Sequence, residues 1–160
     1  MDGGLIVGAS LFGRLAMANT WKKYVKNKDD VIELRRLCCI DDTPKNTESF
    51  FISRSLRWLK QHTSIKLVIS YADETYGHHG GIYKASNFEH VGYTSPQRVI
   101  EWGGRLWHDK TIRTKYKGKL KPFAKRVKDA LERGDAKYVK TKRKNIYLYN
   151  LDERRNNSCV

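Results

Sequence analysis

The sequence predicts one α/β domain with a mixed central sheet flanked by helices. Three observations support this prediction. The chain of 160 residues is long enough for a single buried core but short for two domains of typical size. Short β-prone segments alternate with segments of helical apolar spacing in the order β, β, α, β, α, β. No repeat or low-complexity linker interrupts them, so the domain is expected to span residues 1–160.

The composition excludes disorder and a membrane span. Hydrophobic residues make up 39% of the chain and aromatic residues 11%, which is enough to build a core. The longest apolar stretches are Leu5–Phe12 and Ile65–Ala72, and Gly or Ser interrupts both. A bilayer needs about 20 consecutive apolar residues. We therefore expect no transmembrane helix and no membrane partner.

The N-terminal residues and the cysteines favour a cytoplasmic protein. Asp2 precedes the first apolar run and Arg14 follows it, which is the wrong charge pattern for a secretory signal. The three cysteines, Cys38, Cys39 and Cys159, contain no CxxC pair and suggest no disulfide framework. A reducing compartment is expected.

The first elements are two strands joined by a polar stretch. Leu5–Phe12 has strand composition, and a short helix is expected near residues 21–25. Val31–Ile40 shows partial period-two alternation, which predicts a strand. That alternation places four residues on its buried face: Ile32, Leu34, Cys38 and Ile40.

A turn and an amphipathic helix follow. Residues 41–46 supply turn and capping side chains, and Pro44 is acceptable in a first helical turn. From Asn46 to His62 three apolar residues recur at i, i+4 and i+7, which indicates a helix with one buried face. These residues are Ile52, Leu56 and Leu59.

The most β-prone segment, Ile65–Tyr71, is expected to be a central strand. Asp73 closes it, and a flexible glycine-rich loop covers residues 76–81. Ile82–Ser86 then fits one or two helical turns, and Phe88–Tyr93 returns as a strand.

A hairpin and a third helix are expected in the last third of the chain. Val99–Trp102 and Arg105–His108 are separated by Gly103 and Gly104, and a two-residue glycine connection favours a hairpin. Pro122–Arg133 has the apolar spacing of a helix, with Gly134 as its stop signal.

The last expected strand, Lys144–Leu151, ends a strongly basic region. Residues 103–149 hold 16 Lys and Arg against 4 Asp and Glu, within a chain whose net charge is +15. Cations interleaved with aromatic rings are typical of a nucleic-acid surface. The residues expected to contact the phosphate backbone are Lys110, Arg113, Lys115, Lys117, Lys119 and Lys121, and Trp107 or Trp102 is expected to stack on a displaced base. A charged face that only aids solubility is the alternative.

The start of the helix at Asn46 is a candidate anion site. Backbone N–H groups of a first helical turn attract phosphate, and Lys45 and the Ser49 hydroxyl can assist them. The competing interpretation is that these residues simply cap the helix, and Asp42 would oppose a phosphate if it pointed inward.

The segment Ile82–Gly92, which reads IYKASNFEHVG, resembles the last motif of the Gcn5-related acetyltransferase superfamily. In that superfamily a short helix carrying a tyrosine leads into a strand, and the preceding helix cradles coenzyme A. The resemblance implies a Gcn5-related N-acetyltransferase-like fold, Tyr83 as the acid that protonates the leaving thiolate, and acetyl-CoA or a related acyl donor as cofactor. Asn87 stands where the superfamily usually has glycine.

Residues 30–95 are similar to the phage Mom family. The resemblance rests on four motifs in order: Leu37–Ser49, Ser70–Asp73, Gly77-His78 and Gly81–Phe88. It implies an enzyme that places a small carbamoyl or acetamido-type group on the exocyclic amine of adenine in phage DNA, so that host restriction enzymes cannot cut. Double-stranded DNA is then the expected partner, and base flipping is required because a paired adenine is out of reach.

The resemblance and the chemistry of the side chains imply a set of site residues. Acylation of an aromatic amine needs a base and an acid. The expected catalytic residues are Asp73, Tyr83, His79 and Ser70. The expected cofactor-binding residues are Asp42, Lys45, Asn46, Ser49 and Tyr71.

No metal site is the main expectation, with iron as an alternative. His78, His79 and Asp73 supply two histidines and a carboxylate, a set that can hold ferrous iron. Zinc is less favoured because Cys38 and Cys39 point to opposite faces of a strand.

Two other functions stay open at this point. One is an ordinary acetyl-CoA-dependent N-acetyltransferase, which would bind coenzyme A tightly and ignore DNA. The other is a non-catalytic nucleic-acid-binding protein on the same fold. The sequence leaves the oligomeric state open.

Overall fold

The computed structural model describes residues 6–17 and 19–152, which form two compact units. The first unit joins the described residues up to Tyr93 to those from Asn145 onward, and the second unit is Thr94–Lys144. Asp2, Leu5 and Cys159, named above, lie outside the described residues. A single acetyltransferase-like domain over residues 1–160 stays a prediction.

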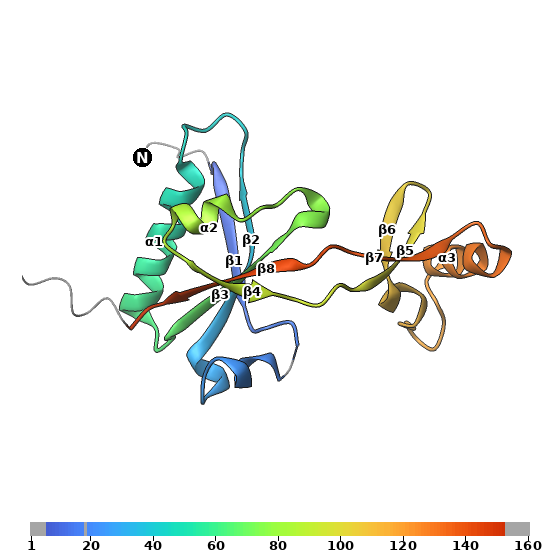
Figure 1. Ribbon diagram of the computed structural model, residues 1–160, viewed down its shortest axis with the longest axis horizontal. Helices are drawn as coiled ribbons and strands as arrows, with labels where there is room; N and C mark the ends of the chain where they lie inside the picture. The colour runs from blue at the N-terminus through green and yellow to red at the C-terminus, as the bar shows by residue number, and fades with distance from the viewer. Residues whose placement is uncertain (1–5, 18, 153–160) are drawn as a thin grey trace, which may run out of the picture. The chain divides into compact units, whose positions relative to one another are not determined.

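The first unit is built on a five-stranded sheet in the order β1-β2-β3-β8-β4 (Figure 1). Its strands are β1 (Gly8–Gly13), β2 (Val31–Cys39), β3 (Leu67–Asp73), β4 (Glu89–Tyr93) and β8 (Lys144–Asn150). β2 and β3 run parallel, whereas β1 pairs with β2 and β4 pairs with β8 in antiparallel fashion. The expected mixed sheet within an α/β fold is confirmed.

Two helices, α1 (Thr47–His62) and α2 (Gly81–Ala85), pack against this sheet (Figure 1). The buried residues of α1 are the three predicted from the apolar spacing, Ile52, Leu56 and Leu59. They join Leu34, Val68 and Tyr147 in one core. Short 3-10 helices are η1 (Thr20–Lys23), η2 (Lys28–Asp30) and η3 (Glu74–Tyr76). Within the described residues, no helix is long and apolar enough to cross a membrane.

β2 differs from the prediction at its second half. Leu11 pairs with Arg36 and Phe12 pairs with Leu34, so an extra residue of β2 bulges out between these pairs. A bulge shifts the alternation of side chains by one position. Leu37 therefore packs against the core. The prediction that Cys38 and Ile40 are buried was wrong, since Cys38 is exposed and Ile40 is 45% exposed.

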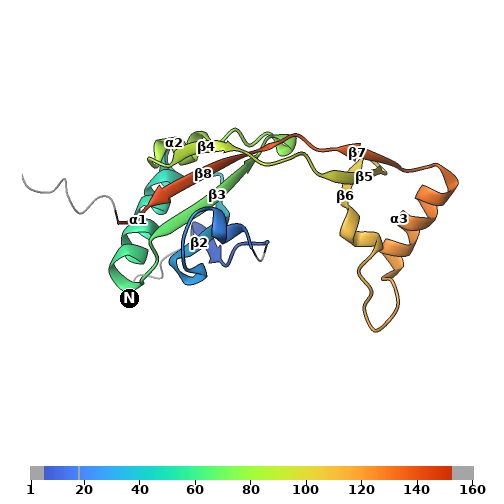
Figure 2. The same cartoon turned by 60° about the horizontal axis from the view of Figure 1, so that its bottom comes forward.

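The second unit pairs a three-stranded antiparallel sheet, in the order β6-β5-β7, with one helix (Figure 2). Its elements are β5 (Arg98–Trp102), β6 (Arg105–His108), η4 (Asp109–Ile112), α3 (Pro122–Arg133) and β7 (Lys137–Lys140). Ile100 of β5 packs with Val127 and Ala130 of α3 in a separate core.

The turn signals of the second unit are confirmed. Gly103 and Gly104 have φ of 57° and 70°, which is the backbone of a two-residue hairpin turn that favours glycine. Gly134 ends α3 with φ of 82°. β7 was not predicted, because four residues rich in lysine have weak strand character until β5 supplies a partner.

Candidate functional site

The parallel pair β2–β3 opens at its carboxyl end. Among the described residues, backbone pairing joins Val31–Glu33 to Leu67–Ile69 and goes no further. At the next position the fully buried Ser70 hydroxyl donates a hydrogen bond of 3.0 Å to the Leu34 carbonyl. The Ser70 side chain thus joins the two strands at the point where their backbone pairing ends. Carboxyl ends of parallel strands are common ligand sites in α/β proteins, so this position is our candidate active site.

Tyr83 of α2 lies against the same position. Its ring packs on Phe88 and Tyr147, with centroid distances of 5.5 and 5.2 Å. Burial raises the pKa of the Tyr83 phenol, a hydrogen bond with Ser70 partly lowers it, and the charge of Glu33 raises it. The phenol is therefore protonated at neutral pH and can serve as a proton donor. The structure brings two of the four expected catalytic residues, Ser70 and Tyr83, into contact.

Tyr71 and Glu33 form a second polar group on the other face of the sheet, since Tyr71 directly follows Ser70 in β3 and Glu33 pairs with Ile69. Burial, followed by the effects of Tyr24 and Glu33, raises the pKa of Tyr71 to about 12. Glu33 also accepts a hydrogen bond of 3.1 Å from the Ala16 backbone N–H. Sequence reasoning missed Glu33, because only the parallel pairing with β3 brings its charge near enough to raise the pKa of Tyr83. The feature of the sequence that could have indicated Glu33 is a carboxylate among the apolar residues of a strand.

The start of α2 is held by Tyr147. Gly80 precedes α2 with φ of 76°, and a methyl group added there would overlap the ring of Tyr147. The Tyr147 hydroxyl donates a hydrogen bond of 3.3 Å to the His79 carbonyl. The backbone of His79 is thereby fixed, while the residue itself is exposed. Close packing of Gly80 on Tyr147 sets the position from which Tyr83 reaches Ser70.

Asp73 occupies the carboxyl end of β3. One of its carboxylate oxygens accepts a hydrogen bond of 3.0 Å from the Thr75 N–H and so caps η3. The neighbouring Glu74 accepts a hydrogen bond of 2.7 Å from the Asn145 amide, which ties η3 to β8. Asp73 thus has a structural contact of its own, three residues beyond Ser70.

The expected cofactor residues gather at the start of α1, except Tyr71. Asn46 adopts a left-handed backbone, with φ of 72°, and its side chain does not cap the helix. The Ser49 hydroxyl donates to the Asn46 carbonyl at 3.0 Å. Lys45 and Asp42 are exposed.

Negative charge also lies near the start of α1. The pKa of Cys39 is raised mainly by burial and next by Glu48, which belongs to the first turn of α1. A carboxylate there opposes an anion. The start of α1 therefore fits a phosphate only in part.

The metal alternative gains no support from the arrangement of side chains. Within residues 6–17 and 19–152, no three His, Cys, Asp or Glu side chains are grouped so that they can hold a metal ion. His78, His79 and Asp73 belong to this described part. We derive no step through iron.

The second unit carries most of the positive charge. Residues 94–144 hold 17 Lys and Arg against 5 Asp and Glu, which is +12 of the net +15. All six cations expected to contact phosphate lie here and are exposed: Lys110, Arg113, Lys115, Lys117, Lys119 and Lys121.

Two of these six cations already have local partners. Arg113 forms an ion pair with the buried Asp109, which Arg98 also approaches at 3.6 Å. Lys117 lies 5.7 Å from the ring centroid of Tyr116. The other four are therefore the better candidates for contacts with phosphate.

Trp107 is part of the packing of the second unit. Its indole N–H donates to the Trp102 carbonyl at 3.2 Å, and its ring stacks on Phe123 with centroids 5.9 Å apart. Both Trp107 and Trp102 pack against the core of this unit. Neither ring stands clear of its neighbours as a platform for a base.

Comparison with known proteins shows which family the chain resembles. The family model described as the Mom protein family matches residues 2–159. A protein of Escherichia phage Mu named methylcarbamoylase mom is 33% identical over 110 residues, which cover 67% of this chain and 45% of that protein. The matched part is thus less than half of the length of that relative.

Proposed function

Since the chain belongs to the Mom protein family, we propose that it is a transferase that modifies adenine in DNA. It places a small carbamoyl or acetamido-type group on the exocyclic amine and so protects a phage genome from host restriction enzymes. One observation carries the proposal most strongly. A protonated Tyr83 contacts Ser70 where the parallel pair β2–β3 opens.

The proposal includes a Gcn5-related acetyltransferase-like fold. Its support is the order of elements: parallel strands β2 and β3 joined by α1, then the short helix α2 with its tyrosine, then β4. The early end of the β2–β3 ladder supports it too, because a gap between two parallel strands admits an extended donor molecule.

The side chains of this site suit transfer to a weak nucleophile. The amine lone pair of adenine is delocalised into the ring, so acid and base assistance both matter. The amine nitrogen bonds to the carbonyl carbon of the donor, and the bond from that carbon to the leaving group breaks. Tyr83 gives its proton to the leaving group, and Asp73 or His79 takes the proton that the amine loses.

The donor is proposed to be acetyl-CoA, which would leave an acetamido group on the purine, or a related acyl compound that itself carries the carbamoyl group. Lys45 and the uncapped start of α1 favour a phosphate-bearing donor, and the carboxylate of Glu48 opposes one. Because the fit is partial, no step is assigned to the donor beyond supplying the transferred carbonyl group.

The second unit is proposed to hold the DNA. Its net charge of +12 suits a polyanion. Extraction of an adenine from a duplex costs on the order of a few kcal/mol, and phosphate contacts from Lys110, Lys115, Lys119 and Lys121 are proposed to offset that cost.

The test is mass spectrometry of nucleosides from plasmid DNA of cells that express this chain. We expect a heavier deoxyadenosine with the unchanged chain and its loss with Tyr83→Phe, because phenylalanine keeps the ring packing but has no proton to give. Asp73→Ala is expected to reduce the product. Tyr76→Phe is the matched control, since the Tyr76 ring is 63% exposed, whereas the Tyr83 ring packs on Phe88 and Tyr147.

Each result separates the proposal from its alternatives. A heavier deoxyadenosine that survives in Tyr83→Phe would remove Tyr83 as the acid. Unmodified DNA from cells with soluble protein would favour one of the other two functions. Binding of coenzyme A would then indicate an ordinary acetyltransferase, and its absence a nucleic-acid binder.

A further inference from the structure

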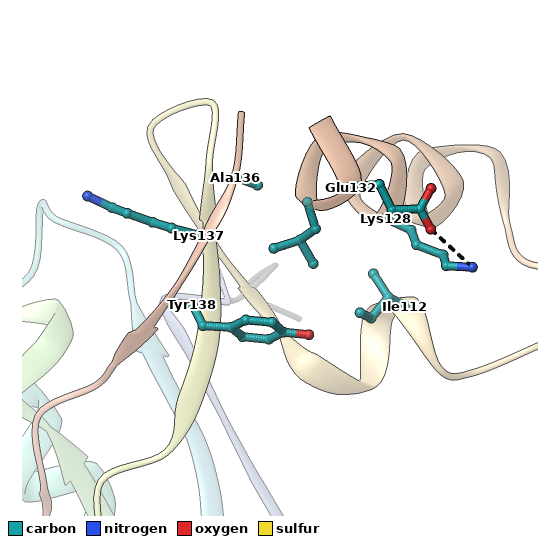
Figure 3. A pocket seen from close by; sticks show the side chains of 7 residues that line it. Ile112, Lys128, Glu132, Ala136, Lys137 and Tyr138 are labelled. Carbon is teal, nitrogen blue, oxygen red and sulfur yellow. Dashed lines mark ion pairs between the residues drawn. The ribbon is translucent and has the colours of Figure 1, made fainter. Parts of the chain in front are cut away.

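The second unit contains an open pocket with an apolar floor (Figure 3). Its volume is about 420 Å³, and it lies between η4, α3 and β7. Its apolar lining comes from Ile112 of η4, Leu131 of α3 and Ala136, which directly precedes β7. A pocket of this size accepts a small planar group. The proposed function assigns it no role.

Tyr138 of β7 forms one wall of the pocket. Its ring extends toward Ile112 (Figure 3) and the residue is 43% exposed. The Arg98 guanidinium lies 4.3 Å from the ring centroid and holds the ring in place through a cation–π contact. A half-exposed ring held in one orientation is a suitable stacking platform for a base, in contrast to the packed ring of Trp107.

The rim of the pocket offers both a hydrogen-bond donor and an acceptor. Lys128 and Glu132 of α3 form an ion pair of 3.5 Å between exposed side chains. The edges of nucleobases carry donors and acceptors together. Lys137 lines the pocket only through its stem, since its ammonium pairs with Glu101 at 3.2 Å and points away from Tyr138 (Figure 3).

We propose that this pocket binds one unpaired nucleotide of a DNA strand, with its base stacked on Tyr138. The argument for this occupant is charge complementarity, because the surrounding unit carries +12 and therefore attracts a phosphodiester chain. A base in a duplex has both faces covered by its neighbours, so only an unpaired base can use the ring. The inference rests on the proposed function only in its choice of DNA.

The test measures binding of a fluorescein-labelled single-stranded DNA oligonucleotide of mixed sequence by anisotropy, at several salt concentrations. Stacking of one base contributes about 1–3 kcal/mol, so we expect Tyr138→Leu to weaken binding about tenfold. The salt slope should stay the same, because no phosphate contact is lost. Tyr138→Phe should bind as the unchanged chain does.

Tyr116→Leu is the matched control, because Tyr116 is a 64% exposed ring beside a lysine in the same unit but outside the pocket. Equal affinities for Tyr138→Leu and the unchanged chain would overturn the proposal, and so would an equal loss in both leucine variants. If circular dichroism shows that Tyr138→Leu does not fold, the double variant Lys128→Ala, Glu132→Ala replaces it, because it removes the donor and the acceptor of the rim together and leaves the net charge unchanged. A fewfold loss would support the pocket, and unchanged binding would overturn it.

Binding of the duplex form of the same oligonucleotide completes the test. The Tyr138→Leu variant should bind the duplex as well as the unchanged chain does, and an equal loss on duplex and single strand would overturn the proposal. None of these measurements requires base modification. A chain that binds through Tyr138 and leaves DNA unmodified would refute the proposed function and retain the pocket.

Discussion

Burial of phenol groups is the main electrostatic feature of the site. Tyr71, Tyr83 and Tyr147 all have a raised pKa, and in each case burial is the largest cause. Ser70 acts in the opposite direction on Tyr83, because its hydroxyl can stabilise the phenolate that remains after proton transfer. This hydroxyl has a single proton, which donates to the Leu34 carbonyl in the structure. Stabilising the phenolate therefore requires the proton to turn from Leu34 toward Tyr83.

The raised pKa of Tyr71 predicts a loss of stability at alkaline pH. The folded chain holds this phenolic proton up to about pH 12, whereas the ordinary value is 10.0. The stability that this difference provides is complete below about pH 10 and disappears as the pH rises through about 12. We expect Tyr71→Phe to reduce the fall of the unfolding free energy in that range, as measured by urea denaturation.

Tyr76→Phe is the control for this experiment, because Tyr76 is 63% exposed. Its pH profile should match that of the unchanged chain. If Tyr71→Phe loses stability with pH as steeply as the unchanged chain, the burial of Tyr71 is not the cause.

Some residues of the site could be predicted from the sequence and others could not. Tyr83 was predicted from its resemblance to a family motif, and the structure places it in contact with Ser70. The contact of Ser70 with Leu34 was not predicted, because it spans 36 residues and depends on where a parallel ladder ends. Glu33 was missed for the same reason.

At the level of helices and strands, the sequence predicted the elements whose formation depends on residues close together in the chain. The apolar spacing within α1 and the Pro and Gly boundaries of α3 identified both helices. The bulge in β2 and the strand β7 depend on partners distant in sequence, β1 and β5. Pairing with a remote strand leaves little trace in a segment of four to nine residues.

The glycine before α2 provides a test of how this short helix is positioned. We expect Gly80→Ala to lower the free energy of unfolding by about 2–4 kcal/mol, because alanine is strained at φ of 76° and its methyl group overlaps Tyr147. DNA modification should be lost as well, since Tyr83 shifts with α2. Thermal denaturation and nucleoside analysis check both results.

Gly77→Ala separates backbone strain from the overlap with Tyr147. Gly77 has φ of 78°, and a methyl group there would meet nothing within 4 Å. We expect Gly77→Ala to lower the free energy of unfolding by only about 1–2 kcal/mol. DNA modification should be retained. Equal costs at the two glycines would show that the contact of Gly80 with Tyr147 does not position α2.

Across the whole chain, the candidate active site and most of the net charge belong to different units. The first unit holds Ser70 and Tyr83, and the second unit, Thr94–Lys144, holds +12 of the net charge. The sequence showed this asymmetry in its last third but did not divide the fold there. The first unit is discontinuous, since β8 returns to its sheet after the second unit is complete.

This division predicts where DNA affinity resides. Replacing Lys115, Lys119 and Lys121 with glutamine should weaken DNA binding. The slope of the logarithm of the binding constant against the logarithm of the salt concentration should become shallower by about 2–3, because each phosphate contact contributes about 0.9 to that slope. The matched control replaces Lys23, Lys26 and Lys28, three exposed lysines of the first unit, with glutamine. Identical salt slopes in the two triple variants would contradict a DNA surface on the second unit.

The most direct measurement is the mass of deoxyadenosine in DNA from cells that express the unchanged chain or Tyr83→Phe. We predict a heavier deoxyadenosine with the unchanged chain, a mass increment that identifies the transferred group, and ordinary deoxyadenosine with Tyr83→Phe at equal amounts of folded protein. Ordinary deoxyadenosine from both, with soluble protein in each, would contradict a DNA-modifying enzyme whose acid is Tyr83.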